Sequence, residues 1–388
     1  MALVALPALL GSAGAALAAP PTKITACPYI ITSPGHYLLM SDCLVGSGGT
    51  AIFITASGVQ LTMAGHTLTG PGDGTGTGIL VTGASGVTIA GGTVTGFENG
   101  VDLDGVSGSR VSGVTAANNL APTPNGNGFW LHGSSGNILA GNTSSGNRTG
   151  FRIENESNNN TLSSDLASTN LGSGFLVRAD ANHSISGNVL VSNTASGNTN
   201  GINLGGGGGT GSVTNTTLQG NDSSANSSGI LLNLAASENL VSANTSNNNV
   251  VVNMAGGNSI VVAGPSNTLQ SNITNGNAGT GIWIMPSATG TTITGNSTSS
   301  NGFYGIDVSS TSNSIQSNTA NSDHFDGIIL RAGATGNTVD SNTALSAVVG
   351  QDLYDGNPMP ALGSCPNTWV GNTFDAGSVG GAGASCIH

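Results

Sequence analysis

The sequence of 388 residues is poor in charge and in aromatic side chains, with charged residues at 6% and aromatic residues at 4%. A helical bundle is excluded, because it needs strong helix formers and charged outer faces, whereas this chain contains 63 Gly. Low-complexity disorder is also excluded, since disorder combines low hydrophobicity with high charge and this chain is 37% hydrophobic. The composition therefore indicates a repetitive structure that buries apolar side chains without helices.

Basic residues are scarce: Lys and Arg number 6 against 18 Asp and Glu, which gives a formal net charge of -12. This charge repels phosphate backbones and anionic lipid surfaces, so we expect no nucleic-acid partner. After residue 19, no apolar run approaches the roughly 18 residues that span a bilayer, so we expect no membrane span.

Residues 1–19 form an apolar segment that ends in small residues, and Ala16-Leu17-Ala18 fits the cleavage pattern of a signal peptide. An apolar capping helix is the alternative interpretation of this segment. With a signal peptide, the protein is expected to be secreted, at the cell surface or in the periplasm.

The four cysteines form two pairs at opposite ends of the chain, Cys27 with Cys43 and Cys365 with Cys386. An even number of cysteines in an exported chain predicts two disulfides, which here would staple the two ends. A metal site would need the four close together, so we predict none. No calcium-repeat motif occurs to support Ca²⁺, and we expect no cofactor.

Asparagine is absent before Asn99, and all 44 asparagines fall in the remainder. There a six-residue phrase, polar-x-aliphatic-x-x-Asn, recurs as in NILAGN and NTLQSN. Its last position is Asn142, Asp165, Asn188, Asn221, Asn244, Asn272, Asn296, Asn318, Asn342 and Asn372. Most steps are 22 to 24 residues and a few are longer, which indicates a fixed coil with loop insertions.

A second phrase, Gly-apolar-variable-apolar, interleaves with the first, as in GILV at Gly78 and GFWL at Gly128, with degenerate copies at Asn249 and Gly350. Alternation at period two predicts a short strand with one buried face. Several short strands per coil predict an all-β right-handed parallel β-helix, a single solenoid of about a dozen coils. Because stacked coils repeat about every 4.8 Å, an Asn at a turn should bond the next Asn in a ladder.

These phrases, with GVQLTMAGHTLTG at residues 58–70 and NTWVGNTF before Cys386, resemble the right-handed parallel β-helix repeat proteins of the pectin-lyase-like superfamily. The resemblance covers most of residues 24–388 and implies the fold. Its members include polysaccharide lyases, glycoside hydrolases and epimerases, so it does not fix the activity. Copper-maturation β-helix proteins share the repeat, but the six His and six Met of this chain form no obvious copper cluster.

The extent of the repeat also suggests where the segments of the chain begin and end. We expect a signal peptide at 1–19, an N-terminal cap and leading strands at 20–56, β-helix repeats at 57–354, and a C-terminal coil and cap at 355–388.

The variable positions of the Gly-led strands are expected to form two outward columns. The first contains Leu80, Asp102, Trp130, Arg152, Leu176, Asn203, Leu231, Val251, Trp283, Asp307, Ile329 and Asp352. The second contains Thr82, Asp104, His132, Glu154, Arg178, Gly205, Asn233, Asn253, Met285, Ser309, Arg331 and Tyr354. Five of the chain's few charged residues thus fall on four consecutive coils.

This cluster is typical of a polysaccharide site, with carboxylates and His for proton transfer and Arg to pair with uronate or stabilise developing charge. The predicted catalytic residues are Asp102, Asp104, His132, Arg152, Glu154 and Arg178. Trp130 and Trp283 are predicted to bind sugar rings. Two coils separate the backbones of Asp104 and Glu154 by about 9.6 Å, near the upper end of the carboxyl separation in inverting glycosidases.

The alternative interpretation is that these charges pair across a solvated face and only stabilise the fold. A second cluster, the segment 323–326 (Asp-His-Phe-Asp) with Asp307, Arg331 and Tyr354, is more typical of turn residues in an acidic chain.

The sequence therefore supports an exported β-helix protein, expected to be a monomer, that binds or cleaves an extracellular polysaccharide or cell-surface glycan, for example one that contains uronate. Cleavage would be of the lyase or hydrolase type. The alternative is a non-catalytic cell-surface or adhesion rod. A cleft around Trp130 favours the first hypothesis, and a flat face favours the second.

Overall fold

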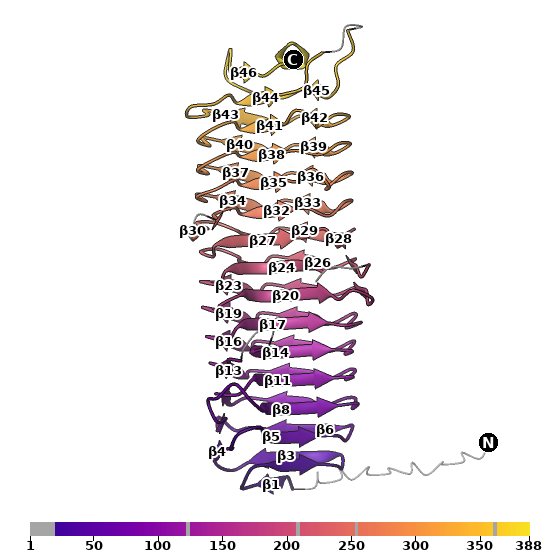
Figure 1. Cartoon of the computed structure of the whole chain (residues 1–388), viewed down its shortest axis with the longest axis vertical. Coiled ribbons are helices and arrows are strands. Elements are labelled where there is room, and N and C mark those ends of the chain that lie inside the picture. The colour runs from indigo at the N-terminus through magenta and orange to yellow at the C-terminus, as the bar shows by residue number, and fades with distance from the viewer. Residues whose placement is uncertain (1–19, 122–124, 207–209, 253–254, 360–362) are drawn as a thin grey trace, which may run out of the picture.

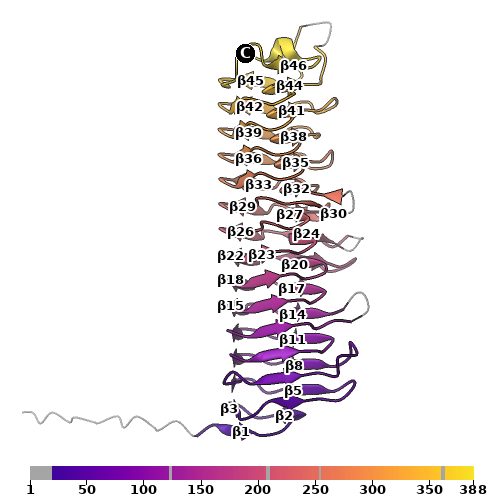
Figure 2. The ribbon, with the colours of Figure 1, turned by 90° about the vertical axis from the view of Figure 1, so that its left-hand side faces the viewer.

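The computed structural model describes residues 20–121, 125–206, 210–252, 255–359 and 363–388, so the predicted signal peptide lies outside the described residues. The chain is a parallel β-helix of about 14 turns, slightly more than expected, and the stacked turns form a straight rod (Figures 1 and 2). The predicted fold class is confirmed. In the described residues the one helix is a short 3-10 turn, η1 (Ala384–Cys386), and none is long and apolar enough to cross a membrane.

Two long sheets, each of 15 strands, run the length of the rod. Sheet 1 contains β1 (Thr22–Ile24), β3 (Gly35–Leu39), β6 (Val59–Thr62), β9 (Thr88–Ala90), β12 (Arg110–Ser112), β15 (Ile138–Ala140), β18 (Thr161–Ser163), β22 (Val189–Val191), β26 (Thr217–Gln219), β29 (Leu240–Ser242), β33 (Thr268–Gln270), β36 (Thr292–Thr294), β39 (Ser314–Gln316), β42 (Thr338–Asp340) and β45 (Thr368–Val370). Sheet 2 contains β2 (Tyr29–Ile31), β5 (Thr50–Ile54), β8 (Thr77–Thr82), β11 (Asn99–Asp104), β14 (Asn127–His132), β17 (Thr149–Glu154), β20 (Ser173–Ala179), β24 (Asn200–Gly206), β27 (Ser228–Leu232), β32 (Ile260–Val262), β35 (Ile282–Ile284), β38 (Ile306–Val308), β41 (Ile328–Leu330), β44 (Leu353–Asp355) and β46 (Val379–Gly380).

The third face is a sheet in two parts. Its strands are β4 (Cys43–Leu44), β7 (Thr67–Thr69), β10 (Thr93–Thr95), β13 (Thr115–Ala117), β16 (Thr143–Ser145), β19 (Leu166–Ser168) and β23 (Thr194–Ser196), then β34 (Ile273–Asn275), β37 (Ser297–Ser299), β40 (Thr319–Asn321) and β43 (Thr343–Leu345). Bridges through Asp222 and Thr245 connect the two parts. Short extra strands are β21 (Ile185–Ser186), β25 (Val213–Thr214) and β28 (Ala236–Ser237), and β30 (Val251–Val252) pairs antiparallel with β31 (Ala255–Gly256).

The core lies inside the rod and is filled by alternate residues of each strand. In sheet 2, the rings of Phe129, Phe151 and Phe175 from three neighbouring strands stack with centroids 4.7 and 4.8 Å apart and nearly parallel planes. This internal stack holds β14, β17 and β20 in register, and the residues between the stacked ones therefore face outward at matching heights.

The Gly that begins each sheet 2 phrase is required by a close approach between coils. A Cβ on Gly150 would collide with the backbone oxygen of Gly174 in the next coil and lie 3.0 Å from the side-chain nitrogen of Asn170. The abundance of Gly thus reflects tight stacking as well as turn conformation.

Buried asparagine ladders line the turns, as predicted. The side-chain oxygen of Asn244 accepts hydrogen bonds from the backbone and side-chain nitrogens of Asn221 at 2.9 Å. Its side-chain nitrogen donates to the backbone oxygen of Leu218 and to the side chain of Asn272. Each ladder residue of this kind satisfies four hydrogen bonds, which is why Asn can be buried at these turns at little cost.

One predicted ladder position is wrong. Asn188 lies in a neighbouring ladder, after Asn160, and the predicted ladder continues from Asp165 to Asn193 and Asn221. The ladders lie five residues apart within a coil, and the same small-residue–Asn pair precedes both turns. The sequence phrase was therefore assigned to the turn before the correct one. The steps from Asp165 to Asn193 and from Asn193 to Asn221 are 28 residues each, where 23 and then 33 were expected.

Two positions of the first outward column are also wrong. Leu231 of β27 pairs with Val261 of β32, so Val261 takes the place expected for Val251. Near the C-terminus Ile329 pairs with Tyr354, which replaces Asp352. Both errors come from degenerate copies of the phrase. Ser259 and Asp352 occupy the positions that align with Gly229 and Gly327 of the neighbouring strands, so the Gly that marks the register in the other copies is missing there.

Both predicted disulfides are present, Cys27–Cys43 near the N-terminal end of the rod and Cys365–Cys386 near the C-terminal end. They tie the first and last coils, which have a neighbouring coil on one side only.

Two carboxylates stand in ladder positions that Asn otherwise occupies. The Oδ1 of Asp165 accepts hydrogen bonds from the backbone and side-chain nitrogens of Asn142, and its Oδ2 is buried with no hydrogen-bond partner among the described residues. Burial raises the pKa of Asp165 to about 7, although the bonds from Asn142 and the charge of Arg110 oppose this. Burial likewise raises the pKa of Asp323 to about 6. In the other ladder residues the amide nitrogen of Asn occupies the place of Oδ2 and donates a hydrogen bond. A protonated carboxyl group can donate a hydrogen bond from this position as well.

Replacing Asp165 by Asn should stabilise the rod at alkaline pH. Because the folded-state pKa lies above the unfolded value, the stability that the proton provides is full below about pH 4 and is lost as the pH rises through about 7. At pH 8 the free energy of unfolding should therefore rise by roughly 4 kcal/mol in the variant, with little change at pH 4. Urea denaturation at both pH values measures this, with the exposed Asp222→Asn as the control. Equal effects at the two pH values would contradict a buried neutral carboxyl group.

Candidate functional site

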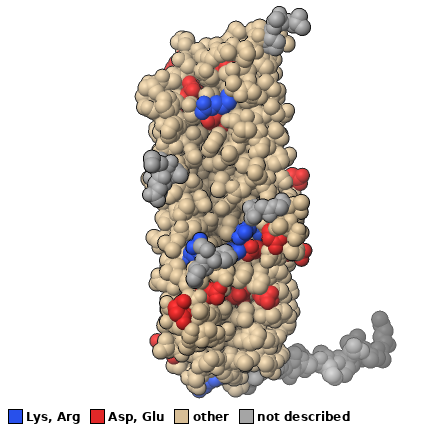
Figure 3. Space-filling model, in the orientation of Figure 1, with Lys and Arg blue, Asp and Glu red and all other residues tan. Residues whose placement is uncertain are grey.

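The predicted cluster of catalytic residues is assembled on sheet 2. Strands β11, β14, β17 and β20 are neighbours, and their register places Asp102, Trp130 and Arg152 in one row. Asp104, His132, Glu154 and Arg178 form the adjacent row. We call these seven residues the charged patch. Figure 3 shows charged side chains gathered on this face of the lower half of the rod.

His132 is held between two carboxylates. Its Nε2 lies 3.0 Å from Oδ1 of Asp102, and its Nδ1 lies 3.5 Å from Oδ1 of Asp104. Burial alone would lower the pKa of His132, but the hydrogen bond and charge of Asp102, together with Asp104 and Glu154, raise it. Burial raises the pKa of Asp102, and His132 opposes that shift.

The other half of the charged patch is an ion-pair network around Glu154. The carboxylate of Glu154 lies 2.6 Å from Nη2 of Arg152 and 3.8 Å from Nη1 of Arg178. The guanidinium of Arg152 also lies over the ring of Trp130, 5.2 Å from its centroid, and that ring packs on His132 at 4.3 Å. Trp130 therefore connects the two halves of the patch.

Several residues of the outward columns are closed to solvent, which the sequence did not predict. The side chains of Asp102, Arg152 and Glu154 are 9%, 5% and 7% exposed. Asp104 and Arg178 remain accessible, at 46% and 34%. Neighbouring side chains of the patch pack against one another, as the guanidinium group of Arg152 does against the ring of Trp130. A ligand can reach Asp104, Arg178 and the partly exposed Trp130 and His132.

Trp283, the other predicted sugar-binding residue, does not lie in the charged patch. It is on β35, six strands along sheet 2 from Trp130, a separation of about 29 Å. It pairs with Asp307 of β38, so it lies beside the second cluster that the sequence indicated.

That second cluster surrounds a hollow of about 430 Å³, which we call the C-terminal hollow. Its lining is Tyr304, Asp326, Ile329, Arg331, Ala332, Tyr354 and Gly356. Arg331 donates two hydrogen bonds to Asp307, at 3.0 and 2.8 Å, and lies 4.5 Å from the centroid of the Tyr304 ring. Burial raises the pKa of Asp326, and Asp307 adds to the shift while Arg331 opposes it.

Aromatic rings on the turns before β38 and β41 flank the C-terminal hollow. The Phe325 ring lies 5.7 Å from that of Phe303 and 5.6 Å from that of Tyr304. Tyr304 was missed at the sequence level, because it precedes the Gly-led strand instead of occupying an outward column. The signal that could have found it is the pair Phe303-Tyr304 in a chain with few aromatic residues.

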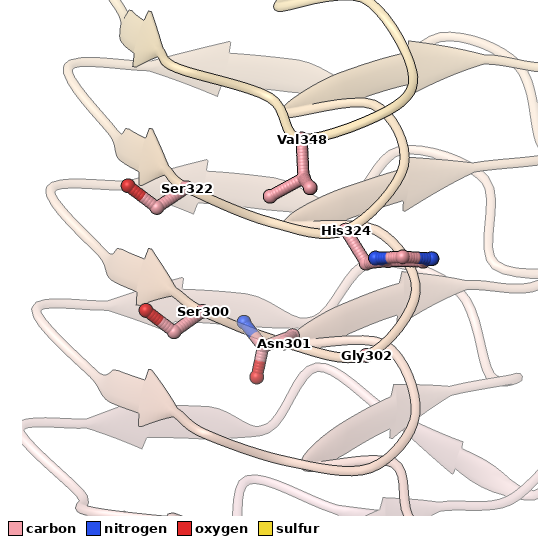
Figure 4. A pocket seen from close by; sticks show the side chains of 6 residues that line it. All are labelled: Ser300, Asn301, Gly302, Ser322, His324 and Val348. Atoms are coloured by element: carbon pink, nitrogen blue, oxygen red, sulfur yellow. The ribbon is translucent and has the colours of Figure 1, made fainter.

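A shallower hollow of about 420 Å³ lies on the turns beside these rings, lined by Ser300, Asn301, Gly302, Ser322, His324 and Val348. Figure 4 shows Ser300 and Ser322 at matching positions of successive coils, with His324 and Val348 on the turns beside them. None of its lining residues is Asp, Glu, Lys or Arg.

Metal ligands are not grouped in the part of the chain that the structure describes. Among those residues there is no group of three or more His, Cys, Asp or Glu side chains that could hold a metal ion. The four cysteine sulfurs are consumed by the two disulfides.

Replacing Glu154 by Gln should destabilise the charged patch. The change removes the carboxylate that compensates the buried guanidinium of Arg152, and breaking one side of a buried ion pair costs about 3 kcal/mol or more. Urea denaturation should show this loss, while Glu156→Gln, at an exposed turn position two residues away, should change stability by less than about 0.5 kcal/mol. A Glu154→Gln protein as stable as the unchanged chain would show that the pair contributes nothing to folding.

Solved structures with the same architecture include the A-module of the mannuronan C-5 epimerase AlgE4 from Azotobacter vinelandii. It is 14% identical to this chain, with a TM-score of 0.51, and the match covers 90% of this chain and 84% of that one. The DFA-IIIase from Arthrobacter chlorophenolicus A6, in complex with DFA-III, is 12% identical with a TM-score of 0.52 and coverage of 80% and 85%. At these identities the likeness shows the fold.

No curated protein matches the sequence. A family model does match, over residues 54–263 and 257–379, and its description is periplasmic copper-binding protein (NosD). Together the two matched segments span most of the β-helix, including the charged patch and the C-terminal hollow. The chain therefore belongs to the NosD family of parallel β-helix proteins.

Proposed function

We propose that this protein is exported and binds an extracellular polysaccharide through the charged patch on sheet 2. The observation that carries the proposal is that Trp130, packed on His132 and Arg152, lies in the row next to the one that contains the accessible Asp104 and Arg178. An aromatic ring can pack against the apolar face of a sugar, and fixed carboxylates and guanidinium groups can hydrogen-bond its hydroxyls.

The charges favour an uncharged glycan over a uronate polymer. The patch contains three carboxylates against two guanidinium groups and the imidazole of His132, and the whole chain has a net charge of -12. Arg152, which the sequence suggested for pairing with uronate, is closed to solvent and pairs with Glu154. A polyanion would meet repulsion along the rod, and Arg178 is the accessible arginine of the patch that could offset it.

Binding without cleavage fits the geometry better than catalysis. Both ring nitrogens of His132 face carboxylates, and Glu154 is engaged by Arg152 and Arg178. A general acid or base must be within reach of the substrate's proton, and these groups already have protein partners. The catalytic roles of the six residues stay a prediction, and we assign the patch to recognition.

The comparisons are consistent with this proposal. The mannuronan C-5 epimerase acts, by its name, on a polysaccharide, and it shares the fold. The family name describes a periplasmic protein, which agrees with the apolar segment at residues 1–19 and with export to the periplasm or beyond.

Copper, the ion in the family's name, is not part of the proposal. Copper favours thiolate, thioether and imidazole ligands. In the described residues the thiols are oxidised and no three His, Cys, Asp or Glu side chains converge. The donor set does not fit a bound copper ion, so we assign the metal no role in this chain's mechanism.

Tryptophan fluorescence tests the proposal directly. In the variant Trp283→Phe, Trp130 is the remaining partly exposed tryptophan, because Trp369 is 4% exposed. Titration with cellotetraose, mannotetraose, tetragalacturonate and tetramannuronate should give a saturable signal with an uncharged sugar. Asp104→Asn should weaken that binding about tenfold, or about 1.4 kcal/mol, because it removes the charge of an accessible carboxylate and replaces one of its two acceptor oxygens by a donor.

The exposed Asp222→Asn is the control and should bind as the unchanged chain does. Tighter binding of the uronate oligomers would contradict the proposed ligand class. No response of Trp130 to any of these sugars or their polymers would overturn the function, and release of new reducing ends would overturn binding without cleavage.

A further inference from the structure

The C-terminal hollow combines the features of the charged patch with a concave shape. Tyr304 and Tyr354 present aromatic rings at its lining, and Ile329 adds an apolar surface. Asp326 and Arg331 supply a carboxylate and a guanidinium group at the same hollow. Concave sites with apolar walls and a few convergent polar groups are the usual form of small-ligand sites.

The charged groups of the hollow are held in place by the fold. Arg331 is fixed by two hydrogen bonds to Asp307, whose side chain is almost closed to solvent, and by its contact with Tyr304. Asp326 accepts a hydrogen bond from the backbone nitrogen of Gln351. A ligand that enters would therefore meet fixed donors and acceptors and would lose little binding energy to ordering them.

The charges of the hollow disfavour an anion as the preferred ligand. Two carboxylates, Asp307 and Asp326, accompany one guanidinium group, and that group donates two hydrogen bonds to Asp307. Aromatic faces with carboxylate acceptors suit a ligand with hydroxyl donors and apolar ring faces, which is the chemistry of an uncharged sugar.

The hollow and the charged patch lie on the same sheet. Asp307 on β38 is seven strands from Trp130 on β14 in the order of sheet 2, a separation of about 34 Å along the rod. Figure 3 shows two groups of charged side chains on this face, one in the lower half and one near the top. Because stacked coils keep this face straight, one extended polymer can lie along it and reach both groups.

We propose that the C-terminal hollow is a second sugar-binding site, and that one uncharged polysaccharide chain bridges it and the charged patch. This inference rests on the proposed function for its ligand class. Two sites on one rigid rod make the second contact intramolecular, so affinity should rise steeply once a glycan is long enough to span them.

The two partly exposed tryptophans allow each site to be followed separately. Trp283 lies one strand from Asp307 and reports the hollow in the variant Trp130→Phe, and Trp130 reports the charged patch in Trp283→Phe. Cellotetraose and mannotetraose, shorter than the separation of the two sites, are compared with soluble glucan and mannan polymers. We expect both tryptophans to respond to the same sugar, and the polymer to bind at least tenfold more tightly than the tetrasaccharide.

Variants of Tyr304 test the hollow itself. Tyr304→Ala should abolish the Trp283 response and remove the advantage of the polymer, while Tyr304→Phe, which keeps the ring face, should retain most of both. The Trp130 response to the tetrasaccharide should be unchanged in both variants, which also shows that they are folded. Asp222→Asn is again the control.

The outcomes separate the two proposals. If Trp130 responds and Trp283 does not, and the polymer binds no more tightly, the second site is wrong and the proposed function stands. If Trp283 alone responds, the hollow binds sugar, but the charged patch does not. That result overturns both the proposed function of the patch and the proposal that one polysaccharide chain bridges the two sites. If neither responds, both proposals fail.

Discussion

The spacing between stacked coils is the constraint on which the rest of this structure depends. Each turn must repeat the backbone path of its neighbour, because the backbone hydrogen bonds of three faces and the side-chain bonds of the asparagine ladders all join adjacent coils. Gly150 and its equivalents are needed where coils touch, and Asn244 and its equivalents where the turns are buried. Composition follows from this repeat: residues that stack on their own kind are abundant, and charged residues are rare because like charges repel at this spacing.

The same constraint positions the candidate sites. A side chain on one strand of sheet 2 lies directly above its counterpart on the previous strand, so residues about 25 positions apart in sequence become neighbours in space. In a rod whose columns are mostly apolar or amide side chains, a few substitutions on consecutive coils are enough to create the charged patch. The internal stack of Phe129, Phe151 and Phe175 beneath it keeps those coils rigid. Function here is a local departure from a repeat that otherwise serves stability.

The fold and the composition of the charged patch could be predicted because both follow from a period. The repeat predicted the fold class and the register of Asp104, His132 and Glu154, and the two cysteine pairs at the ends of the chain predicted the disulfides. Prediction failed where the period is ambiguous, as at Asn188, because ladders five residues apart share the same local pattern. Prediction also failed for the burial of Arg152, because a sequence pattern does not show how long side chains lie across a sheet. It missed Tyr304, because the pattern does not show which turn residues lie at the edge of the sheet.

The central claim is that the outward face of sheet 2 is the surface that meets a glycan. Hydroxyl-radical footprinting with mass spectrometry, in the presence and absence of the bound polysaccharide, tests this claim most directly because it reports accessible aromatic and aliphatic side chains on all faces of the rod in one experiment. We predict reduced labelling of Trp130 and Tyr304 on this face and unchanged labelling of the exposed Val370 on sheet 1. Protection of sheet 1 with continued labelling of Trp130 would contradict the account.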